Sequence, residues 1–142
     1  MLRSGLFIAR AGKKGKGVFT EKNIPANTII EIAPVIVLSA EDRKIIEDTK
    51  LNYYIFEWGD DITKAVVALG YVSMYNHETN SSCEYQMDYK KETISIKTVR
   101  KIKAGEEITI NYAAGQFEWE HPWHVEPKTA KAPAKKAGKK KA

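Results

Sequence analysis

Three short segments, far apart along the chain, carry residue types that can bind a ligand or perform chemistry. Gly15-Lys16-Gly17 lies near the start of the chain and Asn76-His77 near the middle. Gly105 to Tyr112 lies shortly before the Lys- and Ala-rich C-terminal segment. Alternating glycines let a backbone turn tightly and approach a ligand without a Cβ in the way. An amide beside an imidazole offers donors and acceptors suited to a purine edge, and a phenol offers a hydroxyl.

Each segment also has an interpretation that involves no chemistry. The glycine segment fits a turn between strands, and it lacks the third glycine and the helix of a dinucleotide site. An Asn-His pair commonly hydrogen-bonds a turn. Strand alternation places Tyr112 on one face with Ile108 and Ile110, as a core tyrosine whose hydroxyl has one partner. The same alternation turns Glu106 and Glu107 to opposite sides, against a shared acid–base site.

A metal site is not expected. Cys83 is the only cysteine, which excludes a disulfide framework within the chain and a Cys-rich zinc site. His121 and His124 lie far from His77, in a segment without the carboxylate spacing of a metal centre.

Hydrophobic periodicity predicts a mostly β domain with small helices. Thr28 to Leu38 is rich in Ile and Val, and Pro34 within it indicates an edge or a bend. Further strands are predicted over 84–89, 92–99 and 107–112, the first two as a hairpin turning at 90–91. Helices are predicted over 43–50, after a capping box at 39–42, and over 116–121.

Charge divides the chain into an acidic body and a basic end. Seven of the 23 basic residues and none of the 18 acidic ones lie in 128–142, so residues 1–127 carry 16 basic against 18 acidic groups. From Pro127 onward the composition is Lys, Ala, Pro, Gly and one Thr, which cannot bury enough apolar surface to order the backbone. We therefore expect one domain over 1–126 and a disordered basic tail over 127–142.

Neither secretion nor membrane insertion is indicated. The longest uncharged stretch, 65–77, is too short and too polar to span a bilayer. The apolar residues 6–9 are followed at once by Arg10, so no signal peptide is visible. We expect a soluble protein of a reducing compartment, either cytoplasmic or associated with the nucleoid or chromatin.

The order of the three segments resembles that of the SET-domain protein lysine methyltransferases, and most of all their compact stand-alone versions in viruses and prokaryotes. The resemblance covers roughly residues 7–112, and its further segments are Gly17-Val18-Phe19, Ile29-Ile30-Glu31 and Tyr54-Ile55-Phe56. The residues after His77 depart from the family's Asn-His-Ser-x-x-Pro-Asn, which bears on the local loop and not on the Asn-His pair.

This resemblance implies a mostly β fold, a β-clip of small sheets with short helices and a C-terminal pseudoknot. It implies S-adenosyl-L-methionine as the cofactor, on the opposite face from the channel through which the target lysine enters. Tyr112 would be the catalytic residue. The positions implied to bind the cofactor are Lys16 and Gly17 through their backbone, Asn76, His77, Tyr54 and, packed on the adenine, Trp119.

The resemblance also implies an S-adenosylmethionine-dependent protein-lysine N-methyltransferase acting on a lysine-rich protein, histone-like or ribosomal, which the acidic body suits. The tail over 128–142 is similar to the Lys-Ala-Pro repeats of linker histones, which favours phosphate contacts with nucleic acid. It can also serve as a tethered automethylation substrate or as a solubility aid. A homodimer stays open. The competing hypothesis is a non-catalytic, nucleic-acid-associated binding module.

Overall fold

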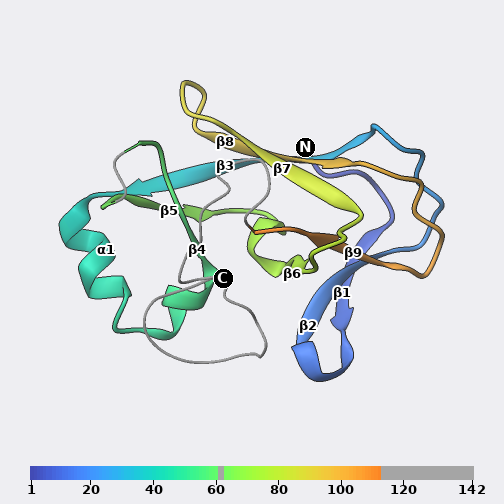
Figure 1. The fold of residues 1–142 in the computed structure, drawn as a ribbon, viewed down its shortest axis with the longest axis horizontal. Coiled ribbons are helices and arrows are strands. Elements are labelled where there is room, and N and C mark those ends of the chain that lie inside the picture. Colours follow the sequence, from blue (N-terminus) through green and yellow to red (C-terminus); the bar gives the residue numbers. More distant parts are fainter. Residues whose placement is uncertain (61–62, 113–142) are drawn as a thin grey trace.

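A single curled, mixed sheet dominates the computed structural model, which describes residues 1–60 and 63–112 (Figure 1). In spatial order its strands are β1 (Leu6–Arg10), β2 (Lys16–Thr20), β9 (Glu107–Ile110), β7 (Cys83–Asp88), β8 (Thr93–Thr98), β3 (Ile29–Leu38), β5 (Ala65–Ala68) and β4 (Ile55–Glu57), and β6 (Asn76–His77) pairs with β9 beside this path. Short 3₁₀ segments cover Gly12–Lys14, Lys50–Tyr54 and Val72–Met74, and the α-helix of the described residues is α1 (Ala40–Ile46). The predicted mostly β fold with short helices is confirmed.

Alternation of apolar and polar residues correctly located the strands at the centre of the sheet. β7 and β8 form the predicted antiparallel hairpin, with Ile94 and Ile96 fully buried between partly exposed neighbours. β9 buries Ile108 and Ile110 as expected, but it ends at Ile110. The prediction that one strand carries Tyr112 on the isoleucine face is therefore wrong, because Tyr112 lies in the turn beyond the strand.

Pro34 does not interrupt β3, which runs unbroken for ten residues. It lies where the strand changes partner: Ile29 to Pro34 pair with β8, and Val35 to Leu38 pair with β5. A residue without an N–H is tolerated at such a junction because the ladder on one side ends there.

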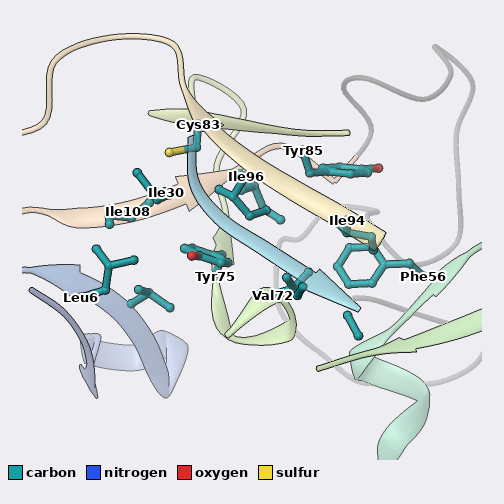
Figure 2. Packing of buried hydrophobic residues seen from close by; sticks show 14 of the residues in the cluster. Leu6, Ile30, Phe56, Val72, Tyr75, Cys83, Tyr85, Ile94, Ile96 and Ile108 are labelled. Atoms are coloured by element: carbon teal, nitrogen blue, oxygen red, sulfur yellow. The ribbon is translucent and has the colours of Figure 1, made fainter. Parts of the chain in front are cut away.

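The main core fills the inside of the curl. Side chains from β3, β7, β8 and β9 meet around Tyr75, which is 1% exposed (Figure 2). A smaller cluster of Leu38, Ile55 and Ala65 lies beneath α1, against Ile46. Burying this apolar surface is the main stabilising contribution to the fold, at about 25 cal/mol per Å².

The helix α1 has its cap where the sequence predicts it, but it covers Ala40–Ile46, so it begins and ends sooner than the predicted 43–50. Ser39 is its N-cap, and its hydroxyl accepts a hydrogen bond from the Asp42 backbone N–H at 3.1 Å. The helix ends at Ile46, and Arg43 ties it to the sheet through Glu57 and the Lys64 carbonyl. Helix α1 and the β1–β2 hairpin lie at opposite ends of the molecule (Figure 1). None of the helices in the described part of the chain is long and apolar enough to cross a membrane.

Residues 113–142 are outside the described part. The predicted helix over 116–121, the domain boundary at 126 and the basic tail all fall there, and they stay predictions.

Candidate active site

Strand β9 brings the three segments together. Val18 of β2, the residue after Gly17, pairs with Ile108 of β9, and β6 pairs in parallel with the end of β9, at Thr109 and Ile110. In that parallel pairing His77 lies opposite Ile110, two residues before Tyr112. Segments about sixty and thirty residues apart in sequence therefore share one short strand, which no local periodicity encodes.

Gly17 lies where the backbone and its neighbours leave no space for a side chain. A Cβ at this position would overlap the Glu107 carboxylate and would lie 2.7 Å from Asn76 Nδ2. The turn of the hairpin is made instead by Gly15, whose φ of 83° is a conformation that favours glycine. Glycine is thus required at the two positions for different reasons: Gly15 shapes the turn, and Gly17 permits close packing at the site.

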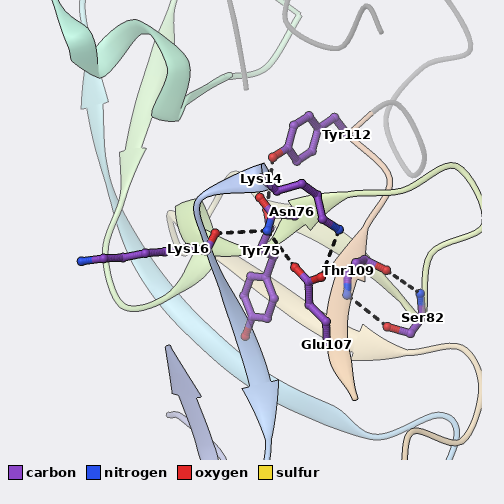
Figure 3. Close-up of polar contacts among 8 residues, drawn as sticks. All are labelled: Lys14, Lys16, Tyr75, Asn76, Ser82, Glu107, Thr109 and Tyr112. Carbon is purple, nitrogen blue, oxygen red and sulfur yellow. Dashed lines mark hydrogen bonds and ion pairs between the residues drawn. The ribbon is translucent and has the colours of Figure 1, made fainter. Parts of the chain in front are cut away.

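The side chain of Asn76 has a fixed orientation. Its Nδ2 donates to the Lys16 carbonyl at 3.1 Å and to Glu107 Oε2 at 2.7 Å (Figure 3). Both partners are pure acceptors, so the amide nitrogen must face them and Oδ1 must face away. Within the described residues Oδ1 accepts no hydrogen bond, and Glu107 Oε1 is held in turn by Lys14 Nζ at 3.0 Å.

His77 fixes the backbone of Tyr112. Its Nδ1 accepts a hydrogen bond from the Tyr112 backbone N–H at 3.1 Å, so in the neutral ring the proton is on Nε2. The two rings also lie close, with centroids 5.0 Å apart. This histidine is a positioning element in the site and does not act only on a turn.

Three further aromatic residues complete the surroundings of Tyr112. The Tyr85 hydroxyl donates to the Tyr112 carbonyl at 2.5 Å, and the Tyr112 hydroxyl donates to the Tyr75 carbonyl at 3.1 Å. Phe56 contacts the Tyr112 ring edge-on, with centroids 6.5 Å apart. The backbone, ring and hydroxyl of Tyr112 are therefore all held, which is the arrangement that a reacting group needs.

The phenol of Tyr112 is kept neutral. Burial raises its pKa above the ordinary value, and the nearby ionisable groups of Tyr54, Glu107 and Tyr85 raise it further. Tyr54 ends the 3₁₀ segment before β4 and is 37% exposed. At neutral pH the Tyr112 hydroxyl is a donor and an acceptor, and it is not a phenolate base.

A buried carboxylate supports this group from behind. Glu31, 2% exposed in β3, accepts the Tyr75 hydroxyl and the Tyr71 N–H, each at 2.8 Å. Burial raises the pKa of Glu31, although the bonds from Tyr71 and Tyr75 lower it. Tyr75 thus links the two groups: its hydroxyl donates to the buried Glu31 carboxylate, and its backbone carbonyl accepts from the Tyr112 hydroxyl.

Comparison with known proteins identifies the architecture. The SET domain family model matches residues 15–113, which include Gly17, Asn76, His77 and Tyr112. The chain belongs to the SET-domain family. It is 38% identical over 120 residues to a Schizosaccharomyces pombe histone-lysine N-methyltransferase specific for H3 lysine-37, covering 84% of this chain and 79% of that protein.

Solved SET-domain structures share the fold. A Plasmodium falciparum protein, described as a candidate histone methyltransferase, superimposes with a TM-score of 0.62 at 21% identity, over 81% of this chain and 98% of that one. An autoinhibited ctPRC2 complex bound to S-adenosylmethionine gives a TM-score of 0.66 at 18% identity, over 80% of this chain and 16% of that one. The SET fold of this chain is therefore shown.

SET domains are protein-lysine N-methyltransferases that use S-adenosylmethionine, and this is the activity of the chain. The residues present fit that cofactor. The space beside the Gly17 backbone is filled by the Glu107 carboxylate and Asn76 Nδ2, which leaves Asn76 Oδ1 as a preset carbonyl acceptor for a polar ligand. Among the described residues no cluster of His, Cys, Asp or Glu could hold a metal ion.

Sequence reasoning located the SET motifs but did not identify the residues that hold Tyr112 and Asn76 in position. Trp119 lies outside the described residues, so its predicted packing on the adenine stays a prediction. Glu106 and Glu107 do separate, with Arg100 and Lys14 as their respective partners, but Glu107 belongs to the site and was not proposed for it. Glu31 did leave a signal, as an acidic residue within an Ile- and Val-rich run.

Proposed function

We propose that this SET-domain chain methylates lysine in a basic protein that is histone-like or otherwise rich in lysine. The observation that carries the proposal is the convergence of Tyr112 with Asn76 and His77 on β9. The specificity of the S. pombe relative for histone H3 supports the substrate class. The excess of acidic groups in residues 1–127 supports it as well, since a weakly negative body attracts lysine-rich segments.

Tyr112 is the catalytic residue in this proposal. S-adenosylmethionine, when bound, supplies a methyl group carried on a positively charged sulfur. Phe56 and His77 hold the ring of Tyr112, and its neutral hydroxyl, bonded to the Tyr75 carbonyl, is able to orient an incoming amine. Because its pKa is raised, the phenol keeps this role throughout the neutral range.

The target amine must be neutral to act as a nucleophile. Removing the proton from a lysine at pH 7 costs about 4–5 kcal/mol, from its reference pKa. Desolvation beside the positively charged sulfur of the bound cofactor would disfavour an ammonium ion there, which lowers this cost. The chain's own contribution is therefore mainly alignment and desolvation.

The cofactor-binding residues in this proposal lie on the side of the site that contains Asn76 and Glu107, which we call the polar side. Lys16 and Gly17 present their backbone, and Asn76 presents Oδ1. His77 shapes the pocket through Tyr112, and Tyr54 lines its wall. We propose Trp119 as the aromatic partner of the adenine.

The partners beyond the substrate are also proposals. The tail of residues 128–142 binds nucleic acid or is itself methylated, which mass spectrometry of the purified enzyme after incubation with cofactor distinguishes. Chromatin or nucleoid association follows from the same phosphate contacts. Homodimer formation is tested by analytical ultracentrifugation.

Replacing Tyr112 by phenylalanine tests the proposed function. We expect Tyr112→Phe to lower methyl transfer to a lysine-rich protein by at least about 100-fold, the usual effect of losing one positioned catalytic hydroxyl. Cofactor binding, measured by titration calorimetry, should persist, because the residues of the polar side are unchanged. Full activity of the variant would remove Tyr112 from its role. Absence of cofactor binding by the native chain would instead favour a non-catalytic binding module.

A further inference from the structure

The tip of the β1–β2 hairpin is strongly basic. Four basic residues, Arg10, Lys13, Lys14 and Lys16, lie within seven positions that contain no acidic residue, and all four are exposed. We call these four the basic tip. It projects at the opposite end of the molecule from α1, and the Lys16 side chain points away from the Asn76–Glu107 contacts (Figures 1 and 3).

The fold gains little from most of this charge. Arg10 and Lys16 lie directly opposite each other in the hairpin, and like charges facing one another across two strands are destabilising. Lys14 pairs with Glu107, but within residues 1–60 and 63–112 the charged groups of Arg10, Lys13 and Lys16 form no ion pair. The charges of Arg10, Lys13 and Lys16 are therefore available to a partner of opposite charge.

The other long hairpin provides a contrast within the same chain. The β7–β8 tip also carries two adjacent lysines, Lys90 and Lys91, but Asp88 and Glu92 flank them. Asp88 Oδ1 also accepts the backbone N–H of both lysines, at 3.1 and 2.9 Å. That tip is neutral in total and its acidic group has a structural role, so exposed lysines alone do not explain the basic tip.

The basic tip is preformed. Gly12 and Gly15 have positive φ angles of 61° and 83°, and the Ala11 N–H donates to the Gly15 carbonyl at 2.6 Å. The Lys14–Glu107 ion pair fastens the same loop to β9. A ligand that meets charges already held in place loses less ordering entropy on binding.

We propose that the basic tip is a contact surface for the phosphate backbone of duplex nucleic acid. A closely spaced row of positive charges matches a duplex, which carries one negative charge per about 1.7 Å of its axis. The tip presents Lys and Arg without an Asn, Gln or aromatic residue among residues 10–17, so the contact is with phosphates and is independent of base sequence. This surface is distinct from the lysines of residues 128–142.

The position of the tip gives the contact a use. Lys14 and the Lys16 carbonyl both reach the polar side of the site, so a duplex held by the tip lies beside the residues that face the cofactor. This use rests on the proposed function: a histone-like substrate bound to nucleic acid would be held near the site both by its nucleic acid, at the basic tip, and by its lysine-rich protein. The binding itself needs no methyl transfer.

Two double variants of the full chain test the proposal. Binding to a short duplex DNA is measured by fluorescence anisotropy between about 50 and 200 mM salt, without cofactor or substrate. Arg10→Gln with Lys13→Gln should weaken binding, and should reduce the slope of log affinity against log salt by about 1.8, at about 0.9 for each lost phosphate contact. The matched control, Lys90→Gln with Lys91→Gln, should leave affinity and slope unchanged.

Each other result overturns the proposal. Equal losses in both double variants would mean a general charge effect, and no loss in either would assign DNA binding to other lysines. Loss of binding to phosphatidylserine vesicles with intact DNA binding would assign the tip to a membrane surface. Thermal unfolding checks the fold: removing the Arg10 charge, which faces Lys16 across the hairpin, should not lower Tm. Methyl transfer to a free peptide is measured separately, so failure of the proposed function stays distinguishable.

Discussion

The two sides of the site are held by different forces. On the tyrosine side, neutral hydrogen bonds from Tyr85 and to Tyr75 fix Tyr112 among packed rings. On the polar side, Asn76 depends on Glu107, whose other oxygen is paired with Lys14, and the lysine side chain is 43% exposed. Exposed ion pairs contribute about 0–1 kcal/mol and weaken with salt, whereas buried hydrogen bonds are insensitive to it.

This difference matches what each side has to do in the proposed function. The group that aligns the reacting atoms has to keep its position to within a fraction of an ångström. The side that faces the cofactor has to release its ligand in every cycle, and a partly solvated polar contact suits exchange. We therefore expect mutations on the tyrosine side to change kcat or stability, and mutations on the polar side to change KM.

Glu31 should give the largest effect, because it supports the tyrosine side from the core. Glu31→Ala leaves the Tyr75 hydroxyl and the Tyr71 N–H without their acceptor. At about 1–3 kcal/mol for each of the two unsatisfied groups, we expect a loss of about 2–6 kcal/mol in the free energy of unfolding. Chemical denaturation measures it, with exposed Glu84→Ala as the control. A loss below about 1 kcal/mol would contradict a supporting role.

The pH dependence of the same residue has a definite sign. Burial raises the folded-state pKa of Glu31 above its ordinary value of 4.5, so the folded state holds the proton more tightly. The contribution of this group to stability is therefore complete below pH 4.5 and is lost as pH rises through the folded pKa. Compared with Glu31→Gln, which does not titrate, the native chain should lose stability as pH rises from 4.5 towards neutrality. A pH-independent difference between the two would contradict this assignment.

Tyr85→Phe should have the next largest effect. It removes the hydroxyl that donates to the Tyr112 carbonyl and keeps the ring that packs against Phe56. Loss of about 1 kcal/mol of alignment corresponds to a fall of about five- to tenfold in kcat. KM for the cofactor should not change. Tyr89→Phe, at an exposed tyrosine, is the matched control.

Lys14→Gln should have the smallest effect and should confirm the contrast between the sides. It removes the ion pair with Glu107 and leaves Asn76 with its direct partners, so we expect at most about a fivefold rise in KM for the cofactor. In the native chain KM should rise with salt, and in the variant this dependence should be weaker. Lys13→Gln, on the same loop without an ion pair, serves as the control. A fall in kcat with unchanged KM would show that the two sides are not separate.

Local sequence patterns predicted the strands whose residues alternate. β7, β8 and most of β9 were located in this way, as was the Ser39 cap. The same rule failed at Tyr112, because alternation applies only while the chain remains extended and β9 ends at Ile110. Pro34 was interpreted as an edge or a bend, whereas its position reflects a change of pairing partner that depends on two distant strands.

The site was predictable only through the ordered set of motifs. Nothing local in Asn76-His77 indicates a parallel pairing with β9, since contacts across more than thirty residues leave no periodic signal. The supporting residues were harder still. Tyr85 and Glu107 each have an ordinary interpretation as strand residues, and only the folded geometry shows that they hold Tyr112 and Asn76.

The change of partner at Pro34 divides β3 into a half that supports the site and a half that lies towards α1. Upstream of it, β3 pairs with β8 and so with the strands that carry the chemistry; downstream, it pairs with β5, and Leu38 belongs to the small cluster under α1. Insertions or replacements within Ala40–Ile46, which precede Tyr54 and Phe56, would remodel that outer end without disturbing the register of β9. A chain of this design can acquire new recognition at one end while its reaction centre stays untouched.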